Sequence, residues 1–313
     1  MPEEIQIHIN SDQAGFRIDA FLAQELPHKS RSSIQKVITE GDCLVNDKVV
    51  RSSYKLRPND DIKIELPDVI PLHADAENIP INIVYEDEEI IVVNKPAGLV
   101  VHPGTGIKSG TLANALVYHF QQLKSLDAIR PGIVHRLDVG TSGLMVVAKN
   151  EAAQLTLAAQ FEQRKVRKIY KALVYGVTND EGKIEAPIGR DPRNRVKMSV
   201  RPEGQGRYAL TFYKAVQRFE EFTLLDVQIK TGRTHQIRVH LSNLKFPIVG
   251  DVGYDSGRVK SVKDAQLRKA IQNLNRPFLH AEQLSFTHPN GKVMEFVAPM
   301  DEVLSSFLEN LES

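Results

Sequence analysis

The chain has 313 residues, 42% of them hydrophobic and 25% charged, with a formal net charge of +1 at pH 7. This composition is typical of a soluble globular protein with one large and one smaller domain, and it excludes a disordered or fibrous chain. No apolar run approaches the ~20 residues that cross a bilayer, so no membrane span is expected. Cys43 is the single cysteine, which excludes disulfide scaffolds and cysteine-based zinc sites and indicates the cytoplasm.

Residues 1–75 are predicted to form a small α/β unit with a linker at its end. In chain order we expect a helix from residue 16, a second helix that Gly41 ends, two short strands about a turn at Asn46-Asp47, and a strand over residues 62–66. The proline-rich segment 67–80 is predicted to be the linker.

A spaced pattern of residues runs through this first unit. It consists of Arg17-Ile18-Asp19, Ser30-Arg31-Ser32, Gln35, Gly41, Asn46 and Leu56-Arg57-Pro58-Asn59-Asp60. The pattern resembles the S4-type RNA-binding domain, and this resemblance implies that Arg31 contacts RNA. A generic α/β module is the alternative.

Residues 76–313 are predicted to form the larger unit, an α+β domain with a mixed, largely antiparallel β-sheet. We expect strands from residue 90 and over 144–148, 169–174 and 222–229, and a hairpin of 278–287 with 292–297. Asn150 is expected to cap a helix in which Leu155, Ala158 and Phe161 recur at helical spacing. A final helix carries Val303, Leu304, Phe307, Leu308 and Leu311 on one stripe.

Four segments of the larger unit combine charged, aromatic and glycine residues. They are residues 94–98 (Asn-Lys-Pro-Ala-Gly), 135–143 (His-Arg-Leu-Asp-Val-Gly-Thr-Ser-Gly), 167–174 (Arg-Lys-Ile-Tyr-Lys-Ala-Leu-Val) and 229–238 (Ile-Lys-Thr-Gly-Arg-Thr-His-Gln-Ile-Arg). Asp138 precedes a glycine-containing turn and a buried strand, where a carboxylate can be aimed at a substrate. Taken alone, an aspartate that only caps the turn explains it equally well.

In this order, the four segments resemble the RluA family of RNA pseudouridine synthases, nearest the large-ribosomal-subunit synthase D subgroup. The resemblance covers essentially the whole chain. It implies the pseudouridine synthase fold and the isomerisation of specific uridines in large-subunit (23S) ribosomal RNA, free or in a pre-ribosomal particle. Since the net reaction is an isomerisation, we expect no cofactor and no metal. We also expect the protein to be a monomer.

The resemblance also implies a role for several residues. Asp138 either attacks the sugar to form a covalent adduct or removes a proton to give a glycal, and Arg233 pairs with it. Tyr170 faces the uracil, and its hydroxyl, or a water that it positions, takes the proton from C5. Arg136 fills the space that a flipped-out nucleotide leaves, with a phosphate contact as the alternative or additional role.

Basic residues concentrate between Arg164 and Arg207, so one face could bind phosphates although the net charge is near zero. We expect backbone contacts from Lys95, Lys168, Arg190, Arg195 and Lys197. The family usually carries Lys-Asp after the aspartate, whereas this chain has Val-Gly at 139–140, which predicts a looser turn. His102 and His135 are expected to order loops through hydrogen bonds.

Two other functions are considered. An S4-bearing ribosome-assembly factor without catalysis would need the basic residues but not Asp138, Tyr170 and Arg233. Phosphotransfer is excluded because the order is His-Arg-Leu-Asp and no glycine-rich loop or Asp-Phe-Gly follows.

Overall fold

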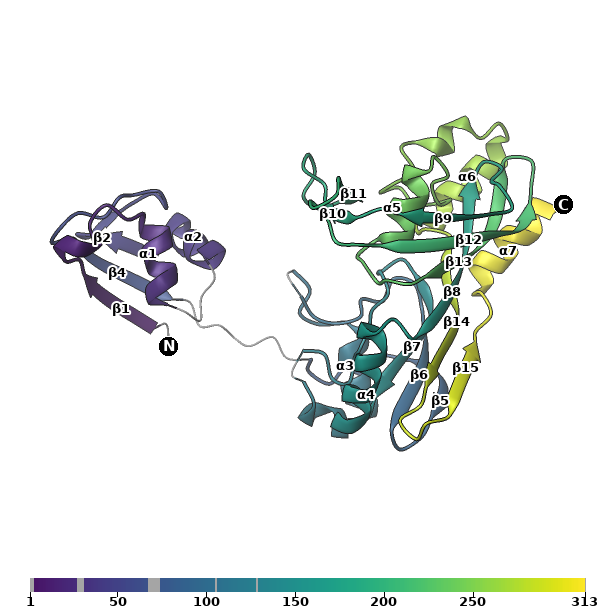
Figure 1. Cartoon of the computed structure of the whole chain (residues 1–313), viewed down its shortest axis with the longest axis horizontal. Coiled ribbons are helices and arrows are strands. Elements are labelled where there is room, and N and C mark those ends of the chain that lie inside the picture. The colour runs from purple at the N-terminus through teal and green to yellow at the C-terminus, as the bar shows by residue number, and fades with distance from the viewer. Residues whose placement is uncertain (1–2, 27–30, 67–73, 105, 128, 313) are drawn as a thin grey trace. The chain divides into compact units, whose positions relative to one another are not determined.

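The computed structural model describes residues 3–26, 31–66, 74–104, 106–127 and 129–312. The chain divides into two compact units, Met1–Pro71 and Leu72–Ser313 (Figure 1). Part of the predicted linker, residues 67–73, lies outside the described residues. Residues 74–80, also predicted as linker, belong instead to the second unit, since Ala74 is buried in its core and the Glu77 carboxylate accepts from the Gly110 N–H at 3.0 Å.

The first unit is a small sheet covered by helices. Its elements are β1 (Glu3–His8), a 3-10 turn (Ser11–Gln13), α1 (Ile18–Glu25), α2 (Arg31–Glu40), β2 (Cys43–Val45), β3 (Lys48–Val49) and β4 (Asp61–Leu66). The strands are antiparallel in the order β1-β4-β2-β3. Ile18, Leu22 and Ile38 bury their side chains against Ile62 and Ile64, as the apolar spacing predicts.

The second unit is built on one large sheet, with the order β5-β6-β7-β14-β8-β13-β12-β9 and with β15 paired to β14. The strands are β5 (Asn82–Glu86), β6 (Ile90–Lys95), β7 (Ser142–Ala148), β8 (Arg167–Tyr175), β9 (Glu181–Glu185), β12 (Leu210–Arg218), β13 (Phe222–Ile229), β14 (Leu279–Thr287) and β15 (Val293–Val297). Every pairing in this sheet is antiparallel except that of β7 with β14, so the expected mixed, largely antiparallel architecture is confirmed.

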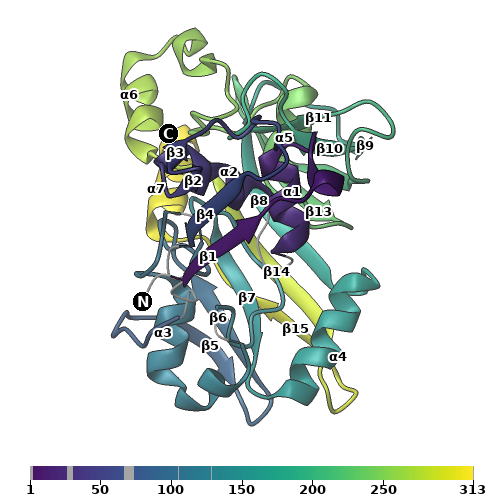
Figure 2. The ribbon, with the colours of Figure 1, turned by 90° about the vertical axis from the view of Figure 1, so that its left-hand side faces the viewer.

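Helices flank this sheet, and a separate two-stranded hairpin stands beside it. The helices are α3 (Leu112–His119), α4 (Glu151–Glu162), α5 (Gln236–Asn243), α6 (Ala265–Leu274) and α7 (Glu302–Glu312), with 3-10 turns at Gln121–Ser125 and Arg258–Ser261. The hairpin pairs β10 (Ile188–Arg190) with β11 (Met198–Val200). Figure 2 shows α3 and α4 at the end of the unit that also carries β5.

Strands β6 and β7 are buried on both faces of the sheet, which explains their continuous apolar sequences. Side chains alternate between faces along a strand. Ile91 and Val93 accordingly join the core that α3 and α5 cover, whereas Ile90 and Val92 join the core under α4. Gly143 has a φ of +118°, and a Cβ there would overlap the backbone of Ala281 on β14. Only glycine therefore permits β7 and β14 to meet at this point.

The predicted hairpin 278–287/292–297 and the cap at Asn150 are confirmed, the cap by a 2.9 Å bond from the Ala153 N–H. The expected apolar face of that helix is only partly confirmed, since Phe161 packs on the core but Leu155 and Ala158 are exposed. Leu155 is 67% exposed, and Ala153 and Leu157 are the buried residues of α4. The small Ala153 side chain permits a close approach to the sheet that spacing alone does not reveal.

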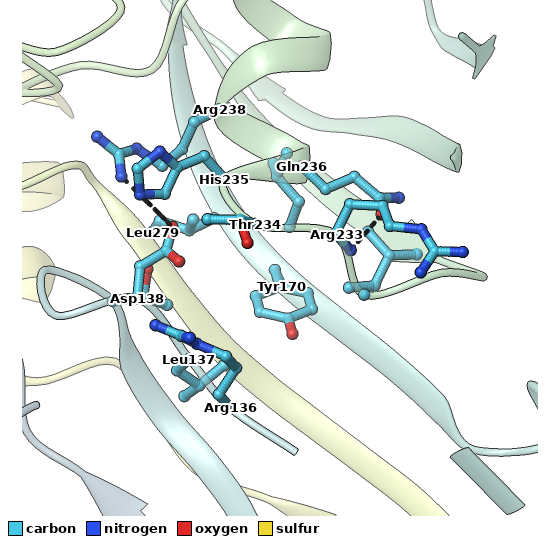
Figure 3. Close-up of a pocket in the computed structure, with 14 residues that line it drawn as sticks. Arg136, Leu137, Asp138, Tyr170, Arg233, Thr234, His235, Gln236, Arg238 and Leu279 are labelled. Atoms are coloured by element: carbon cyan, nitrogen blue, oxygen red, sulfur yellow. Dashed lines mark hydrogen bonds and ion pairs between the residues drawn. The ribbon is translucent and has the colours of Figure 1, made fainter. Parts of the chain in front are cut away.

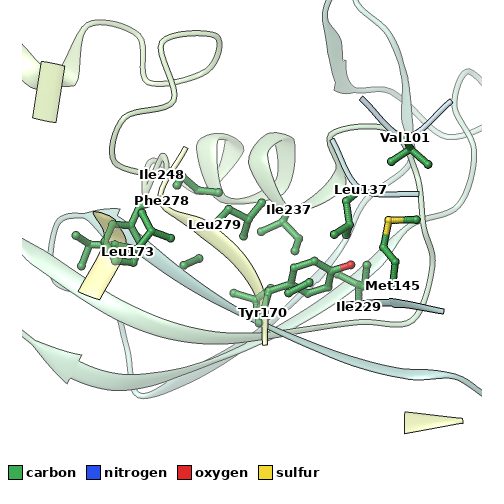
Figure 4. Close-up of a cluster of buried hydrophobic side chains, with 14 of the residues drawn as sticks. Val101, Leu137, Met145, Tyr170, Leu173, Ile229, Ile237, Ile248, Phe278 and Leu279 are labelled. Carbon is green, nitrogen blue, oxygen red and sulfur yellow. The ribbon is translucent and has the colours of Figure 1, made fainter. Parts of the chain in front are cut away.

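The larger core extends directly beneath the end of α5. Figure 4 shows Tyr170 among Leu137, Ile229, Ile237 and Leu279, which come from a loop, β13, α5 and β14. Four separate segments thus meet around one aromatic ring of the central strand β8.

Candidate active site

A pocket with about 490 Å³ of empty space opens where these segments meet (Figure 3). Its lining residues are Arg136, Leu137, Asp138, Thr141, Tyr170, Ile229, Gly232, Arg233, Thr234, His235, Gln236, Ile237, Arg238 and Leu279. Three of the four segments singled out in the sequence therefore converge on it from different parts of the chain.

Asp138 lies in the turn that leads into β7. Two backbone hydrogen bonds hold the turn. Within it, the Thr141 N–H donates to the Asp138 carbonyl at 3.0 Å, and from outside it the Gly98 N–H donates to the Val139 carbonyl at 2.7 Å. The Gly140 Cα also packs so closely on the Pro277 ring that a Cβ would come within 2.8 Å of it. The looser turn expected from Val-Gly is therefore not observed.

The cation beside Asp138 is Arg238. Its Nη1 lies 3.4 Å from Asp138 Oδ2, while its Nε and Nη2 donate to the two Asp251 oxygens at 2.7 and 2.8 Å. Asp251 is 1% exposed. A bidentate bond to a buried carboxylate fixes the plane of the guanidinium. One donor of Arg238 is thereby aimed at Asp138.

The expected pairing of Asp138 with Arg233 is wrong. Arg233 precedes α5, and its Nε donates to the Tyr208 carbonyl at 3.0 Å. Figure 3 shows its guanidinium on the side of the pocket away from Asp138. The buried Gln236 side chain fixes this turn by accepting from the Arg233 N–H at 3.0 Å and from Thr231 Oγ1 at 2.7 Å. Arg238 projects instead from the first turn of the helix, toward Asp138.

His235 and Tyr254 complete the surroundings of the Asp138–Arg238 pair. Tyr254 accepts from the Met198 N–H at 2.9 Å, and its hydroxyl lies 2.8 Å from His235 Nδ1. We assign the hydroxyl as the donor to Nδ1, which leaves the proton on Nε2, 3.9 Å from Asp138 Oδ2. Burial lowers the pKa of His235, so the ring is neutral near pH 7. The Arg238 guanidinium lies over the Tyr254 ring, 4.8 Å from its centroid.

Tyr170 is at the centre of the sheet, where β8 pairs with both β13 and β14. The residue is 6% exposed and its ring forms part of the pocket wall. Burial first, and then the nearby Asp138 charge, raise the pKa of the Tyr170 phenol well above its usual value. The hydroxyl is therefore protonated at neutral pH.

Residues 89–243 match the family model described as RNA pseudouridylate synthase, and residues 16–62 match that of the S4 domain. The chain is 42% identical over 309 residues to the ribosomal large subunit pseudouridine synthase D of Xanthomonas campestris pv. campestris, which covers 98% of this chain and 92% of that protein. An uncharacterized RNA pseudouridine synthase of Aquifex aeolicus is 47% identical over 302 residues, 95% of this chain and 94% of that protein. The chain belongs to the RNA pseudouridine synthases.

A solved structure agrees with this assignment. Human RNA pseudouridylate synthase domain containing 4 superposes with a TM-score of 0.59 at 26% identity, over 74% of this chain and 93% of that one. The predicted pseudouridine synthase fold and the isomerase class are confirmed. Among the described residues, no cluster of three or more His, Cys, Asp or Glu is arranged to hold a metal, and no helix is long and apolar enough to cross a membrane.

Lys95 of the synthase is not on the surface. It is 1% exposed, and its ammonium donates to the carbonyls of Pro96 and Leu99 at 2.8 and 2.9 Å. Burial lowers the pKa of Lys95 to about 8. The expectation that Lys95 contacts the RNA backbone is therefore wrong. Residues 94–98 instead build the support of the Asp138 turn, to which the Gly98 N–H donates.

The other basic residues named from the sequence are exposed or partly exposed. Arg136 and Lys168 line one groove next to the pocket. Lys197 donates to the Gly253 carbonyl at 2.6 Å, and Arg190 donates to the Arg195 carbonyl at 2.7 Å, both in the β10–β11 region. Arg31, in the first unit, shares the buried Asp19 carboxylate with Arg17. RNA contacts by these residues stay predictions.

Sequence reasoning missed Arg238, His235, Tyr254 and Asp251 as parts of the site. Arg238 and His235 stand in the segment that was singled out, so a comparison of both arginines as partners of Asp138 could have found the pair. Tyr254 and Asp251 carry no motif. They reach the site only through the loop after α5, which the sequence does not position.

His135 behaves as expected of a residue that orders a loop. Its Nε2 accepts from the Val146 N–H at 3.0 Å, and its ring stacks on Phe161 with centroids 4.5 Å apart. Burial lowers the pKa of His135 to about 3, so it is a neutral acceptor throughout the physiological range. His102 Nδ1 lies 3.0 Å from the Pro103 carbonyl, which is also a local contact.

Proposed function

We propose that this synthase isomerises specific uridines of large-subunit ribosomal RNA in the cytoplasm, with Asp138 as the catalytic carboxylate. The observation that carries the proposal is the Asp138 carboxylate at the wall of a pocket, beside the fixed Arg238 guanidinium and near the Tyr170 ring. The ribosomal substrate is supported by the names of relatives such as the Xanthomonas enzyme, a large-subunit synthase D.

The reaction breaks the N1–C1′ bond of uridine, turns the uracil, and joins C5 to C1′. Asp138 acts at the sugar, either as a nucleophile at C1′ or as a base at C2′. Arg238 compensates the carboxylate charge in both cases, which a partly buried carboxylate needs. Because Asp251 holds the guanidinium from its other side, Arg238 can stay in place while the Asp138 oxygen moves toward the sugar.

The C5 proton leaves after the new bond forms, and the N1 position gains one, so atoms balance without a further reactant. Tyr170 packs against the uracil and keeps its own proton, because the pKa of its phenol is raised. Of the two roles considered for its hydroxyl, positioning the water that takes the C5 proton is therefore favoured over direct removal by a phenolate.

Access to C1′ requires the target nucleotide to leave its stack, which costs a few kcal/mol. Arg136 is exposed, two residues before Asp138, and lines the pocket. We infer that its guanidinium occupies the space of the flipped-out nucleotide and offsets part of that cost.

The test maps pseudouridines in ribosomal RNA from cells that lack the gene and carry a plasmid copy. Wild type should restore modification at a defined set of 23S positions, and Asp138→Asn should not. The matched control is Asp180→Asn, since the Asp180 side chain is 89% exposed and pairs only with Arg218 among the described residues. Restoration by Asp138→Asn would refute the catalytic role, and an unchanged 23S map in the deletion strain would refute the substrate.

A further inference from the structure

A second groove adjoins the active-site pocket, with about 1200 Å³ of empty space, and shares part of its wall. The residues that line both are Arg136, Tyr170, Ile229, Gly232 and Arg233. The basic residues that line the groove are Arg136, Arg164, Lys168, Arg207, Lys230 and Arg233, against one acid, Glu162, among the described lining residues. A groove of this charge favours an anionic ligand that is continuous with whatever enters the pocket.

Two of these arginines contact Tyr208, and a third, Arg207, lies close enough to Arg233 to lower its pKa. The Arg164 guanidinium carbon lies 5.2 Å from the Tyr208 ring centroid, Arg233 Nε donates to the Tyr208 carbonyl at 3.0 Å, and Arg207 is the preceding residue. The Tyr208 hydroxyl donates to Glu185 at 2.8 Å, which holds the ring in place. We call Arg164, Arg207 and Arg233 the arginine triad.

The charge of the triad is not balanced by an ion pair to any residue that the structure describes. In the described part of the chain, no carboxylate oxygen lies within ion-pair distance of any of the three guanidiniums, and Glu185 is engaged by Lys183 and Tyr208. Burial, and then the charges of Arg207 and Arg164, lower the pKa of Arg233. Like charges held at close range cost free energy in the empty site, and a bound anion removes that cost.

The backbone at Arg164 supports the same conclusion. This residue follows the end of α4 and has a φ of +59°, the left-handed conformation that usually takes glycine after a helix. An arginine there carries a backbone penalty that glycine would not. The penalty is explained if the guanidinium is needed over Tyr208 for a ligand.

We propose that the arginine triad binds a single internucleotide phosphate of the RNA strand, adjacent to the nucleotide held at Asp138. Planar guanidinium groups match phosphate oxygens in geometry as well as charge. The shared wall at Arg233 places this phosphate beside the target nucleotide. The inference rests on the proposed function, because the phosphate is attributed to the substrate RNA. Arg233, which does not pair with Asp138, thereby has a role in binding the strand.

The test measures binding of a fluorescein-labelled uridine nonamer to the full-length protein over a range of salt concentrations. Arg164→Gln, Arg207→Gln and Arg233→Gln should each weaken binding and reduce the slope of log K against log salt by up to about 0.7, the value for one phosphate of a single strand. In the triple variant this slope should fall by about 0.7 in total, because the three guanidinium groups share one phosphate. Lys292→Gln, an exposed change in the β14–β15 turn, should leave the slope unaltered.

Asp138→Asn should bind the nonamer with the wild-type slope, so this assay stays informative even if no ribosomal uridine proves to be a target. With a 23S rRNA transcript as substrate, the triad variants should raise KM and leave kcat unchanged. Unaltered slopes and KM values in all three would overturn the proposal. If the slope of the triple variant falls by the amount expected for three separate phosphates, the single shared site is overturned.

Arg164→Gly separates a binding role from a structural one. Because glycine relieves the left-handed backbone, this variant should have an unchanged or higher Tm and a reduced salt slope. A lower Tm with a wild-type slope would show that Arg164 serves only to end α4 and would remove it from the triad.

Discussion

Replacing Arg238 by Met should both destabilise the second unit and abolish isomerisation. Met keeps much of the volume of the side chain and removes its charge. Asp251, 1% exposed, then loses the two donors that bind it at 2.7 and 2.8 Å. Asp138 loses its neighbouring cation at the same time.

The magnitude follows from the burial of the Arg238–Asp251 pair. Breaking a buried ion pair by removing one partner costs about 3–5 kcal/mol, because the other charge stays buried and uncompensated. For a domain of this size, each kcal/mol lost from the free energy of unfolding lowers the Tm by about 2–4 °C. The Tm of the second unit should therefore fall by roughly 6–20 °C. Arg233→Gln also removes one positive charge, but it breaks no ion pair with a carboxylate among the described residues. The free energy of unfolding should therefore fall by no more than about 1 kcal/mol.

The assay combines thermal unfolding with isomerisation of ribosomal RNA from the deletion strain. The double variant Arg238→Met/Asp251→Asn should regain most of the lost Tm, because the fully buried carboxylate at position 251 is no longer left as an unpaired charge, and should stay inactive. The reasoning is refuted if Arg238→Met melts like wild type, if Arg233→Gln costs as much, or if the double variant recovers activity.

Three further outcomes are expected. Gly143→Ala should lower the free energy of unfolding by at least about 2 kcal/mol, because the new Cβ would overlap the β14 backbone at a positive φ. Leu155→Ala, at an exposed position, should change it by no more than about 0.5 kcal/mol. Equal denaturation midpoints for the two variants would contradict this. Burial lowers the pKa of Lys168 to about 8, so its ammonium loses its proton as the pH rises through that value. RNA binding should then weaken between about pH 7 and about pH 9 in wild type but less in Lys168→Arg, which stays charged; identical pH profiles would argue against a phosphate contact. Tyr254→Phe keeps the ring under Arg238 but removes the bond to His235, and should lower kcat about tenfold at unchanged KM; a wild-type kcat would show that the hydroxyl does not position the site.

Much of the secondary structure could be predicted from local patterns. The apolar run at 144–148 and the Asn150 cap are determined by contacts within a few residues, and they are observed as expected. The buried face of α4 was predicted only in part: Phe161 packs on the core as expected, but Leu155 and Leu157 are equally apolar and only the approach of the sheet decides between them.

The sequence by itself determined the family, through the resemblance of four motifs, and the α+β class, through local apolar patterns, and it singled out Asp138 within one of those motifs. Tertiary structure decided which cation meets that carboxylate. Arg233 and Arg238 stand five residues apart in one segment, but Gln236 holds the first in a turn, while Asp251 and Tyr254, from the loop after α5, hold the second over the pocket. It also decided that Lys95 is buried support rather than RNA contact. Side-chain direction depends on packing between distant segments, and no local pattern encodes it.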